Sequence, residues 1–217
     1  PPAIIWLDDQ QNNLERTPLS ARKASDEKAA LILQAATKVL TRQGYARTTI
    51  KEVAAEAGVS RGLLHYYFKN KEEMLFTVVR QSVADSVQLT ELIMNQSRNH
   101  KELAANIIRA MRQFVEQSPD LISIIFESWS LARQSGSARA ELENTYNLFR
   151  QGMAGGLKNA VARGVLTPST PLMQMATLLT AFIDGLSFEL LIVSGLRQEK
   201  EFWKASQKAL EAMLKAL

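Results

Sequence analysis

The sequence predicts an all-α protein, and three observations support this prediction. Two short helical patterns meet at Ala57-Gly58-Val59-Ser60, a long pattern without proline or glycine runs from Lys71 to about Gln96, and five more helical patterns follow. The breaks between the later patterns contain serine, glycine or proline, which are common turn and cap residues. No segment is assigned to a strand.

The first helix is expected from Glu27 to Gln43. Its apolar stripe consists of Ile32, Ala35, Ala36, Val39 and Leu40, and Gly44 is placed to end it. The segment before it has no helical period and is interpreted as an N-terminal arm, residues 1–24. We expect the helix to pack across the two short helices as the third member of a small bundle.

The two short helices are expected on either side of a tight turn. Thr49 is a favourable N-cap for the first, whose inner face is formed by Ile50, Val53 and Ala54. Gly58 follows where a left-handed residue is needed, and the Ser60 hydroxyl can cap the second helix. The chain therefore stops, turns and starts again within a few residues.

In the second short helix, Leu64 and Phe68 are four residues apart and are expected to face inward. The outward residues are then Arg61, Gly62, Leu63, His65 and Tyr66. This spacing lets a small domain place one helix in a DNA groove, but an αα-hairpin of a protein that does not bind DNA can share it.

A longer ordered pattern connects these helices to a known family. It contains Gly44-Tyr45, Thr48-Thr49, the turn at 57–60, Tyr67-Phe68 and Lys71-Glu72. In this order the features resemble the N-terminal domain of the TetR family of transcriptional repressors, over residues 27–75. The resemblance implies an N-terminal three-helix DNA-binding domain with a helix-turn-helix (residues 25–70), followed by a C-terminal helical ligand-binding and dimerisation domain (residues 71–217).

Nine residues are candidates to contact operator DNA. They are Thr49 and Ser60 for phosphates, Arg61, Leu63 and His65 for base edges, Gly62 for close approach to the backbone, and Tyr66, Tyr67 and Lys71 for positioning by phosphate contact. The role of Lys71 comes from the family resemblance. For Tyr67, the alternative to a phosphate contact is packing in the core. Leu63 departs from the small polar residue that is commoner in the family, and a thymine methyl group is its expected partner.

The charge distribution agrees with a DNA-binding N-terminal region. The net charge is +4, with 26 Lys and Arg against 22 Asp and Glu. Residues 22–80 hold eleven basic and six acidic side chains, whereas residues 81–217 hold fourteen and thirteen. Solvated helix faces also carry such charges, so the excess supports DNA binding without establishing it.

The composition argues against several other kinds of site. The chain has no cysteine and only two histidines, His65 and His100, which leaves little for a metal site, a thiol redox sensor or a catalytic triad. We therefore expect no enzyme activity, no metal and no cofactor. No run of eighteen apolar residues and no signal-peptide pattern is found, so a soluble cytoplasmic protein without membrane association is expected.

The C-terminal half is expected to form helices over residues 101–117, 119–133, 138–163, 171–194 and 199–217. The candidates to line a ligand pocket are Met111, Phe114, Phe126, Trp129, Arg133, Tyr146, Phe149, Met153 and Phe182. Such a lining would suit an apolar or aromatic small molecule, and for each residue a place in a plain hydrophobic core is the alternative. Arg109, Arg112 and Glu127 could select a charged group of the ligand if they face inward.

The segment from Leu178 to Val193 is apolar around most of its circumference, so it must be covered on most sides. The dimer interface is expected at Leu178, Ala181, Gly185, Phe188 and Ile192, as the family resemblance implies. Asp184 and Glu189 interrupt this segment on different faces. Each is expected to accept a hydrogen bond at an interface or to face the ligand.

These features together predict a ligand-responsive transcriptional regulator. The expected protein is a repressor that binds a palindromic operator in double-stranded DNA as a homodimer and is released by an unknown small-molecule effector. In the family, the helix that corresponds to residues 71–96 couples ligand binding to the separation of the two DNA-reading heads. The alternatives are a helical protein-binding adaptor, a small-molecule-binding protein without sequence-specific DNA binding, and a helical enzyme.

Overall fold

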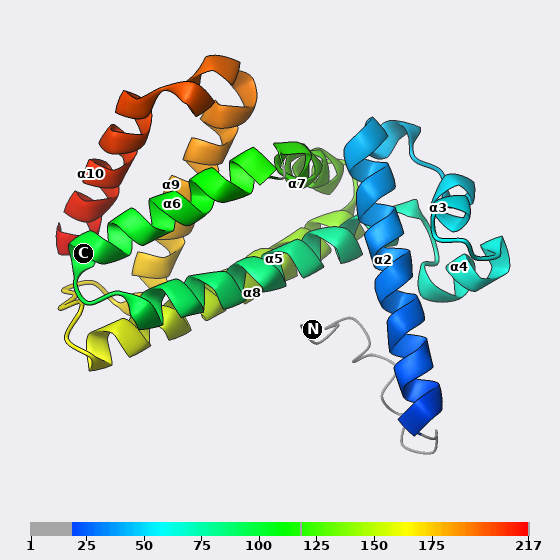
Figure 1. The fold of residues 1–217 in the computed structure, drawn as a ribbon, viewed down its shortest axis with the longest axis horizontal. Coiled ribbons are helices and arrows are strands. Elements are labelled where there is room, and N and C mark those ends of the chain that lie inside the picture. The colour runs from blue at the N-terminus through cyan, green and yellow to red at the C-terminus, as the bar shows by residue number, and fades with distance from the viewer. Residues whose placement is uncertain (1–18, 118, 217) are drawn as a thin grey trace. The chain divides into compact units, whose positions relative to one another are not determined.

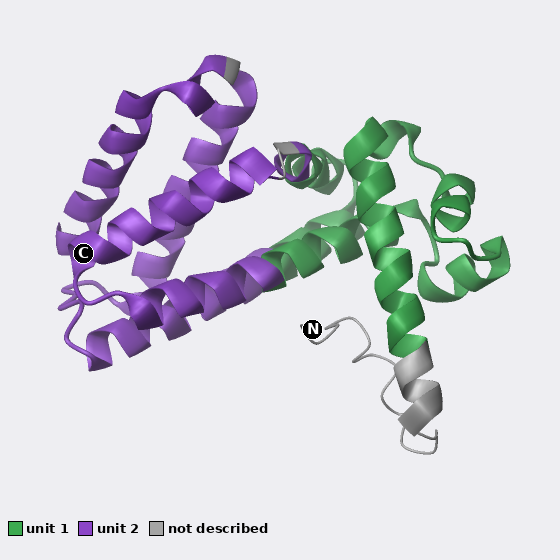
Figure 2. Ribbon diagram, in the orientation of Figure 1, with its two compact units in different colours: residues 1–84, 123–145 green, residues 85–122, 146–217 purple. Residues whose placement is uncertain are grey.

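The computed structural model describes residues 19–117 and 119–216, and every regular element in these ranges is a helix (Figure 1). The prediction of an all-α fold is therefore confirmed. The chain divides into two compact units, shown in Figure 2. Residues up to 84 together with 123–145 form unit 1, and residues 85–122 together with 146–217 form unit 2.

Unit 1 contains the three N-terminal helices α2 (Leu19–Arg47), α3 (Ile50–Glu56) and α4 (Arg61–Tyr67). Helix α2 packs against α3, and α3 packs against α4. Their apolar faces form a core that includes the fully buried residues Ile32, Ala36, Val39, Leu40, Val53, Leu64 and Phe68. These positions follow the helical spacing of the sequence, because each helix turns one stripe inward.

Helix α2 is longer than predicted. It begins at Leu19 rather than Glu27, so the end of the segment interpreted as an arm is helical, while residues 1–18 lie outside the described residues. The sequence between Leu19 and Glu27 is rich in Ala, Arg and Lys, which favour helix even without an apolar stripe. Gly44 (φ 77°, ψ 165°) interrupts α2 as expected, and the helix resumes for a short turn to Arg47.

Three further helices each contribute residues to both units. They are α5 (Lys71–Gln96), α7 (Pro119–Ala132) and α8 (Gly136–Ala162), and Figure 2 shows the change of unit along α5. Within unit 1, the start of α8 is joined to α5, because Ser137 donates a hydrogen bond to Glu72 (3.1 Å) and Arg80 forms an ion pair with Glu141. Unit 1 is therefore built from more than the N-terminal helices.

Unit 2 is completed by α6 (His100–Gln117), α9 (Leu172–Ile192), the 3-10 helix η2 (Ser194–Gln198) and α10 (Lys200–Ala216). Helices α6 and α10 lie side by side (Figure 1). Their buried faces include Leu103, Ile107, Ile108, Met111, Val115, Trp203, Leu210 and Leu214. The bounds of these helices agree with the predicted ranges to within a few residues, but η2 was not predicted.

Helix α8 approaches α5 closely in unit 2 because two of its residues are glycine. A Cβ atom at Gly152 would overlap the side chain of Val87, and one at Gly156 would overlap the sulfur of Met94. A Cβ at the neighbouring Gly155 would meet no atom of the described residues within 4 Å. The first and third glycines therefore set the spacing between these two helices.

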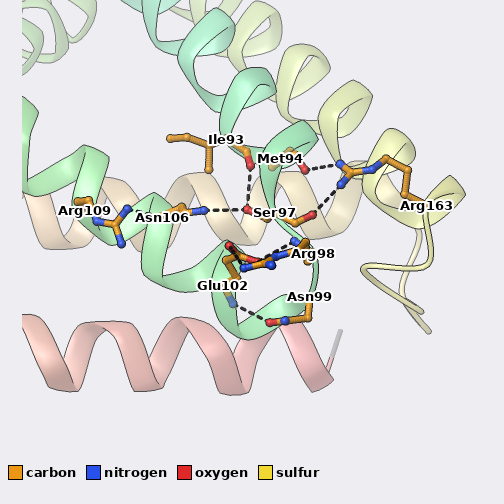
Figure 3. Close-up of polar contacts among 9 residues, drawn as sticks. All are labelled: Ile93, Met94, Ser97, Arg98, Asn99, Glu102, Asn106, Arg109 and Arg163. Atoms are coloured by element: carbon orange, nitrogen blue, oxygen red, sulfur yellow. Dashed lines mark hydrogen bonds and ion pairs between the residues drawn. The ribbon is translucent and has the colours of Figure 1, made fainter.

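A cluster of polar contacts joins the end of α5 to α6 and α8, as drawn in Figure 3. Arg163 donates to the carbonyl oxygens of Met94 (2.9 Å) and Ser97 (2.8 Å). Ser97 is fully buried, and its hydroxyl accepts a hydrogen bond from Asn106 of α6 (3.1 Å). The Asn99 side chain accepts from the Glu102 amide (2.9 Å), as an N-cap does. Carbonyls at the C-terminus of α5 thus obtain a partner that the helix itself does not supply.

Candidate DNA-binding and ligand-binding sites

Helix α3 begins with a complete capping box. The Thr49 hydroxyl accepts a hydrogen bond from the Glu52 amide (3.3 Å), and the Glu52 carboxylate accepts from the Thr49 amide (2.9 Å) and hydroxyl (2.7 Å). These bonds from Thr49, with another from Gln43 (3.1 Å), lower the pKa of Glu52. The predicted cap is confirmed. A phosphate that approaches Thr49 also meets this carboxylate, and the phosphate contact itself stays a prediction.

The turn between α3 and α4 has the conformation that the sequence predicted. The Val59 amide donates to the Ala54 carbonyl (2.9 Å) and the Gly58 amide to the Ala55 carbonyl (3.2 Å), which is a Schellman motif. Gly58 has φ 66°, in the left-handed region that favours glycine. Ser60 then caps α4, because its hydroxyl accepts from the Leu63 amide (3.1 Å).

Helix α4 buries Leu64 and exposes most of its candidate DNA contacts. Leu64 and the following Phe68 are fully buried, as predicted. The exposed residues are Arg61, Gly62, His65 and Tyr66, whereas Leu63 and Tyr67 are half-buried. The Tyr67 hydroxyl lies 3.5 Å from the Ser25 carbonyl of α2, and its ring meets the Tyr66 ring edge-on. Tyr67 therefore contributes to the packing of α4 on α2.

Lys71, the first residue of α5, is engaged within unit 1. Its ammonium group donates to the Ala46 carbonyl (3.0 Å) and lies 4.4 Å from the centre of the Tyr45 ring. A phosphate contact by Lys71 stays a prediction, and it would compete with these two interactions. Burial raises the pKa of the Tyr45 phenol, and the carboxylates of Glu72 and Glu127 raise it further.

Part of the N-terminal excess of positive charge is already paired. Glu56 of α3 binds Lys38 (2.5 Å) and Arg42 (3.2 Å) of α2, and the hydrogen bond from Lys38 contributes most to lowering the pKa of Glu56. Arg61, in contrast, has no hydrogen-bond or ion-pair partner among residues 19–117 and 119–216. Its guanidinium group is therefore available for a partner outside this chain.

The nine candidate ligand-lining residues fall in both units. Phe126, Trp129 and Arg133 belong to unit 1, where the first two rings meet edge-on at 4.5 Å and Arg133 is exposed just beyond α7. The other six belong to unit 2: Met111 and Met153 are buried, and Phe114, Tyr146, Phe149 and Phe182 are half-buried. The two methionines thus have the burial of core residues, and the half-buried aromatics keep part of their surface accessible.

Tyr146 has a polar partner within unit 2. Its hydroxyl donates to the Asp184 carboxylate of α9 at 3.0 Å. Burial raises the pKa of Asp184, and the hydrogen bond from Tyr146 partly opposes that effect. Asp184 is therefore a carboxylate whose charged form is disfavoured by its surroundings.

All five predicted dimer-interface residues are exposed on α9. Leu178, Phe188 and Ile192 have exposed fractions of 48%, 48% and 65%, and Ala181 and Gly185 are exposed between them. We call these five residues the α9 stripe. Their spacings alternate between three and four, so they lie on one face, opposite the buried Met175, Ala176, Leu179 and Leu190.

Two matches to protein families identify the chain. Residues 32–78 match the family described as "Bacterial regulatory proteins, tetR family", and residues 100–215 match "BetI-type transcriptional repressor, C-terminal". The second match alone covers more than half of the chain. The protein belongs to the TetR family. It is thus a DNA-binding transcriptional regulator with an N-terminal helix-turn-helix.

Individual TetR-family relatives agree with this assignment. The uncharacterized HTH-type transcriptional regulator YfiR of Bacillus subtilis is 28% identical over 174 residues, which cover 78% of this chain and 83% of that protein. BetI of Rhizobium meliloti is 26% identical over 155 residues, 71% of this chain and 73% of that protein. The structure of FadR from Bacillus subtilis in complex with stearoyl-CoA has a TM-score of 0.67 at 19% identity over 87% of this chain and 98% of that one, which shows the same fold.

For this TetR-family member, sequence reasoning missed the partner of Glu127. Glu127 is a candidate to select a charged group of the ligand, but its carboxylate accepts a hydrogen bond from the Tyr45 amide (2.7 Å) in unit 1. The two residues are 82 positions apart, so helical periodicity gave no sign of the contact. Glycine at position 44 is the one local hint, because glycine can adopt the φ 77° and ψ 165° that turn the next amide away from the helix.

Proposed function

We propose that this regulator is a repressor that binds a palindromic operator as a homodimer and leaves it when a small molecule binds in the C-terminal domain. The α9 stripe is the observation that supports the proposal most, because an exposed row of apolar and small residues suits a second copy of the same helix. A twofold axis would present two copies of α4 to a palindrome. The match to BetI-type repressors supports repression rather than activation.

The DNA-binding domain of this proposal comprises residues 25–70. Arg61 would read a guanine edge, and Leu63 and His65 would contact neighbouring bases, with half-site centres about 34–36 Å apart. Thr49, Ser60, Tyr66, Tyr67 and Lys71 would hold phosphates. Among the described residues, a Cβ at Gly62 would meet only the Ser60 hydroxyl, at 3.9 Å, so none of them requires glycine there. A close approach of the DNA backbone gives a reason for it.

The C-terminal domain, residues 71–217, would bind the effector and form the dimer. The aromatic pair on α7 and the half-buried aromatic residues of unit 2 support an apolar or aromatic effector. The stearoyl-CoA bound by FadR from Bacillus subtilis is consistent with an effector that has an apolar part. To release the operator, this effector must bind the released conformation more tightly than the DNA-bound one, because equal affinity shifts no equilibrium.

A cytoplasmic location is part of the proposal. Helix α9 is long and apolar enough to cross a membrane by length and composition, and only 28% of its most apolar stretch is buried. The core helix of a soluble protein passes the same test. Pairing of two α9 stripes accounts for the exposed apolar surface without a membrane.

The test is selection of genomic DNA fragments by the purified protein, followed by gel-shift titration of the best fragment across a salt series. The expected result is a palindromic site, bound by two chains, whose affinity falls steeply with salt because phosphates are neutralised. Transcription from the neighbouring promoter should rise when the gene for the regulator is deleted. Weak binding that is indifferent to sequence, or a fall in transcription after deletion, would contradict the proposal.

A further inference from the structure

The turn that precedes α3 is held by a side chain from α7. Gly44 has φ 77° and ψ 165°, and this ψ rotates the following peptide group away from the helical orientation. The amide of Tyr45 therefore donates to the Glu127 carboxylate, at 2.7 Å. Because the acceptor is charged and the distance is short, this bond is stronger than an ordinary backbone hydrogen bond.

The close approach of Glu127 also depends on glycine at position 44. A Cβ atom at Gly44 would lie 3.0 Å from the second carboxylate oxygen of Glu127. Position 44 thus needs glycine for its positive φ and for the space that the carboxylate occupies. Glu127 of α7 therefore accepts from the Tyr45 amide and also occupies the space beside Gly44 that a Cβ atom would need.

The anchored turn leads directly into the DNA-binding helices. The Thr48 hydroxyl donates to the Gly44 carbonyl (2.8 Å), its amide donates to the Tyr45 carbonyl (3.2 Å), and Thr48 is 1% exposed. The next residue, Thr49, is the N-cap of α3. The two hydrogen bonds of Thr48 thus tie the residue before the N-cap of α3 to the Gly44-Tyr45 turn, so a displacement of the Tyr45 amide is passed to α3.

We propose that Glu127 is a positioning residue for operator binding, which fixes the orientation of α3 and α4 within unit 1 through the Tyr45 amide. It stands on the same helix as Phe126 and Trp129, the candidate effector-contacting pair. A shift of α7 would thus reach the DNA-binding helices through one hydrogen bond. The inference rests on the proposed operator binding and names a residue that positions the helices for it.

The test compares three variants of the full chain. Glu127→Ala removes the acceptor, Glu127→Asp keeps the charge but shortens the side chain, and Glu127→Gln keeps an oxygen at the same reach. Glu143→Ala and Glu143→Asp are the controls, since Glu143 is an exposed carboxylate of the same unit. Each variant is titrated with the selected operator fragment and with a scrambled duplex of equal length, and hydrogen exchange of the Tyr45 amide is measured.

The expected result is a roughly tenfold loss of operator affinity and a roughly tenfold faster exchange of the Tyr45 amide for the Ala and Asp variants, as loss of one charged hydrogen bond allows. Binding to the scrambled duplex and far-ultraviolet circular dichroism should stay unchanged. The Gln variant should recover roughly threefold of each loss, because its neutral amide oxygen accepts at the same reach but more weakly than a carboxylate, and the controls should match the wild type.

Several outcomes overturn the inference. If the wild type prefers its operator and the Ala and Asp variants bind it equally well, Glu127 does not position the helices, although the proposed function stands. Failure of Gln to recover the affinity, or an equal loss on both duplexes, also overturns it. A wild type that shows no operator preference overturns the proposed function together with the inference.

Discussion

Arg61 and Asp184 are the two side chains whose surroundings most directly suggest a measurement. Arg61 is exposed at the first position of α4 and has no partner among the described residues. Asp184 is half-buried on α9, where Tyr146 donates to it. The Arg61 guanidinium is available to an external partner, whereas burial disfavours the charged form of Asp184.

Replacing Arg61 with alanine should reduce operator discrimination. A bidentate contact with guanine contributes about 1–3 kcal/mol of discrimination, so operator affinity should fall roughly 5- to 150-fold. Binding to random duplex DNA should fall much less. Gel-shift titrations with both duplexes measure the ratio, and Arg139→Ala, at an exposed arginine of α8 in the same unit, is the matched control. Equal losses on both duplexes would show that Arg61 contacts only phosphates.

Asp184→Asn should stabilise the protein at neutral pH. Because burial raises the pKa of Asp184 in the folded state, the fold binds its proton more tightly than the unfolded chain does. The resulting penalty is absent at pH values below the unfolded pKa of about 3.9 and grows as pH rises through the folded pKa. The Asn variant lacks this penalty and can still accept from Tyr146.

Thermal unfolding at a series of pH values measures this effect. The melting temperature of Asp184→Asn should exceed that of the wild type near pH 7, and the two should converge toward pH 4. Glu189→Gln removes an exposed carboxylate from the same helix and should change stability little, as surface substitutions do. If the melting temperature of Asp184→Asn differed from that of the wild type by the same amount at every pH, the raised pKa of Asp184 would be refuted.

At the scale of elements, sequence patterns located the helices better than they located the contacts between them. Thr49, Gly58 and Ser60 have local signals, because a cap or a left-handed turn depends on neighbouring residues, and the structure confirms all three. The early start of α2 was missed because helix propensity without an apolar stripe leaves no periodic signal. The partners of Glu127 and Asp184 were missed because their contacts join distant parts of the chain.

The close spacing of α5 and α8 also depends on contacts between distant parts of the chain, and it can be tested by substitution. Gly152→Ala should destabilise the protein by about 1–3 kcal/mol, because the new methyl group overlaps the stiff, branched side chain of Val87. Gly155→Ala should instead stabilise it by about 0.5–1 kcal/mol, since its Cβ meets none of the described residues within 4 Å and glycine is unfavourable in a helix. Urea denaturation measures the change in the free energy of unfolding for each variant. A stabilising Gly152→Ala would contradict the close approach of α8 to α5.

At the scale of the whole molecule, the α9 stripe is an apolar surface whose residues are exposed on α9. Singly exposed apolar residues are common on soluble proteins, whereas a row of them at helical spacing suits a partner surface. The proposed dimer covers it and also supplies the twofold symmetry that a palindromic operator requires. Dimerisation and operator binding should therefore fail together.

Leu178→Glu should weaken the dimer at least about tenfold, because it places charge inside the apolar interface. Sedimentation velocity across a dilution series measures the dissociation constant, and gel-shift titration should show a parallel loss of operator affinity. Leu89→Glu is the matched control, because Leu89 of α5 is exposed to a similar extent (45% against 48%) outside the stripe. A dimer of unchanged strength in Leu178→Glu would exclude the α9 stripe as the interface.

The composition of unit 1 has a practical consequence for exchanging recognition modules among regulators. A chimera that joined residues 19–84 of this chain to a foreign sensor would lack α7. It would therefore lack the Glu127 carboxylate, which accepts a hydrogen bond from the Tyr45 amide. The transplanted head would then carry an unmatched backbone donor beside Gly44. A graft that also transfers residues 123–145 keeps that pair intact, so the separable cassette is discontinuous in sequence.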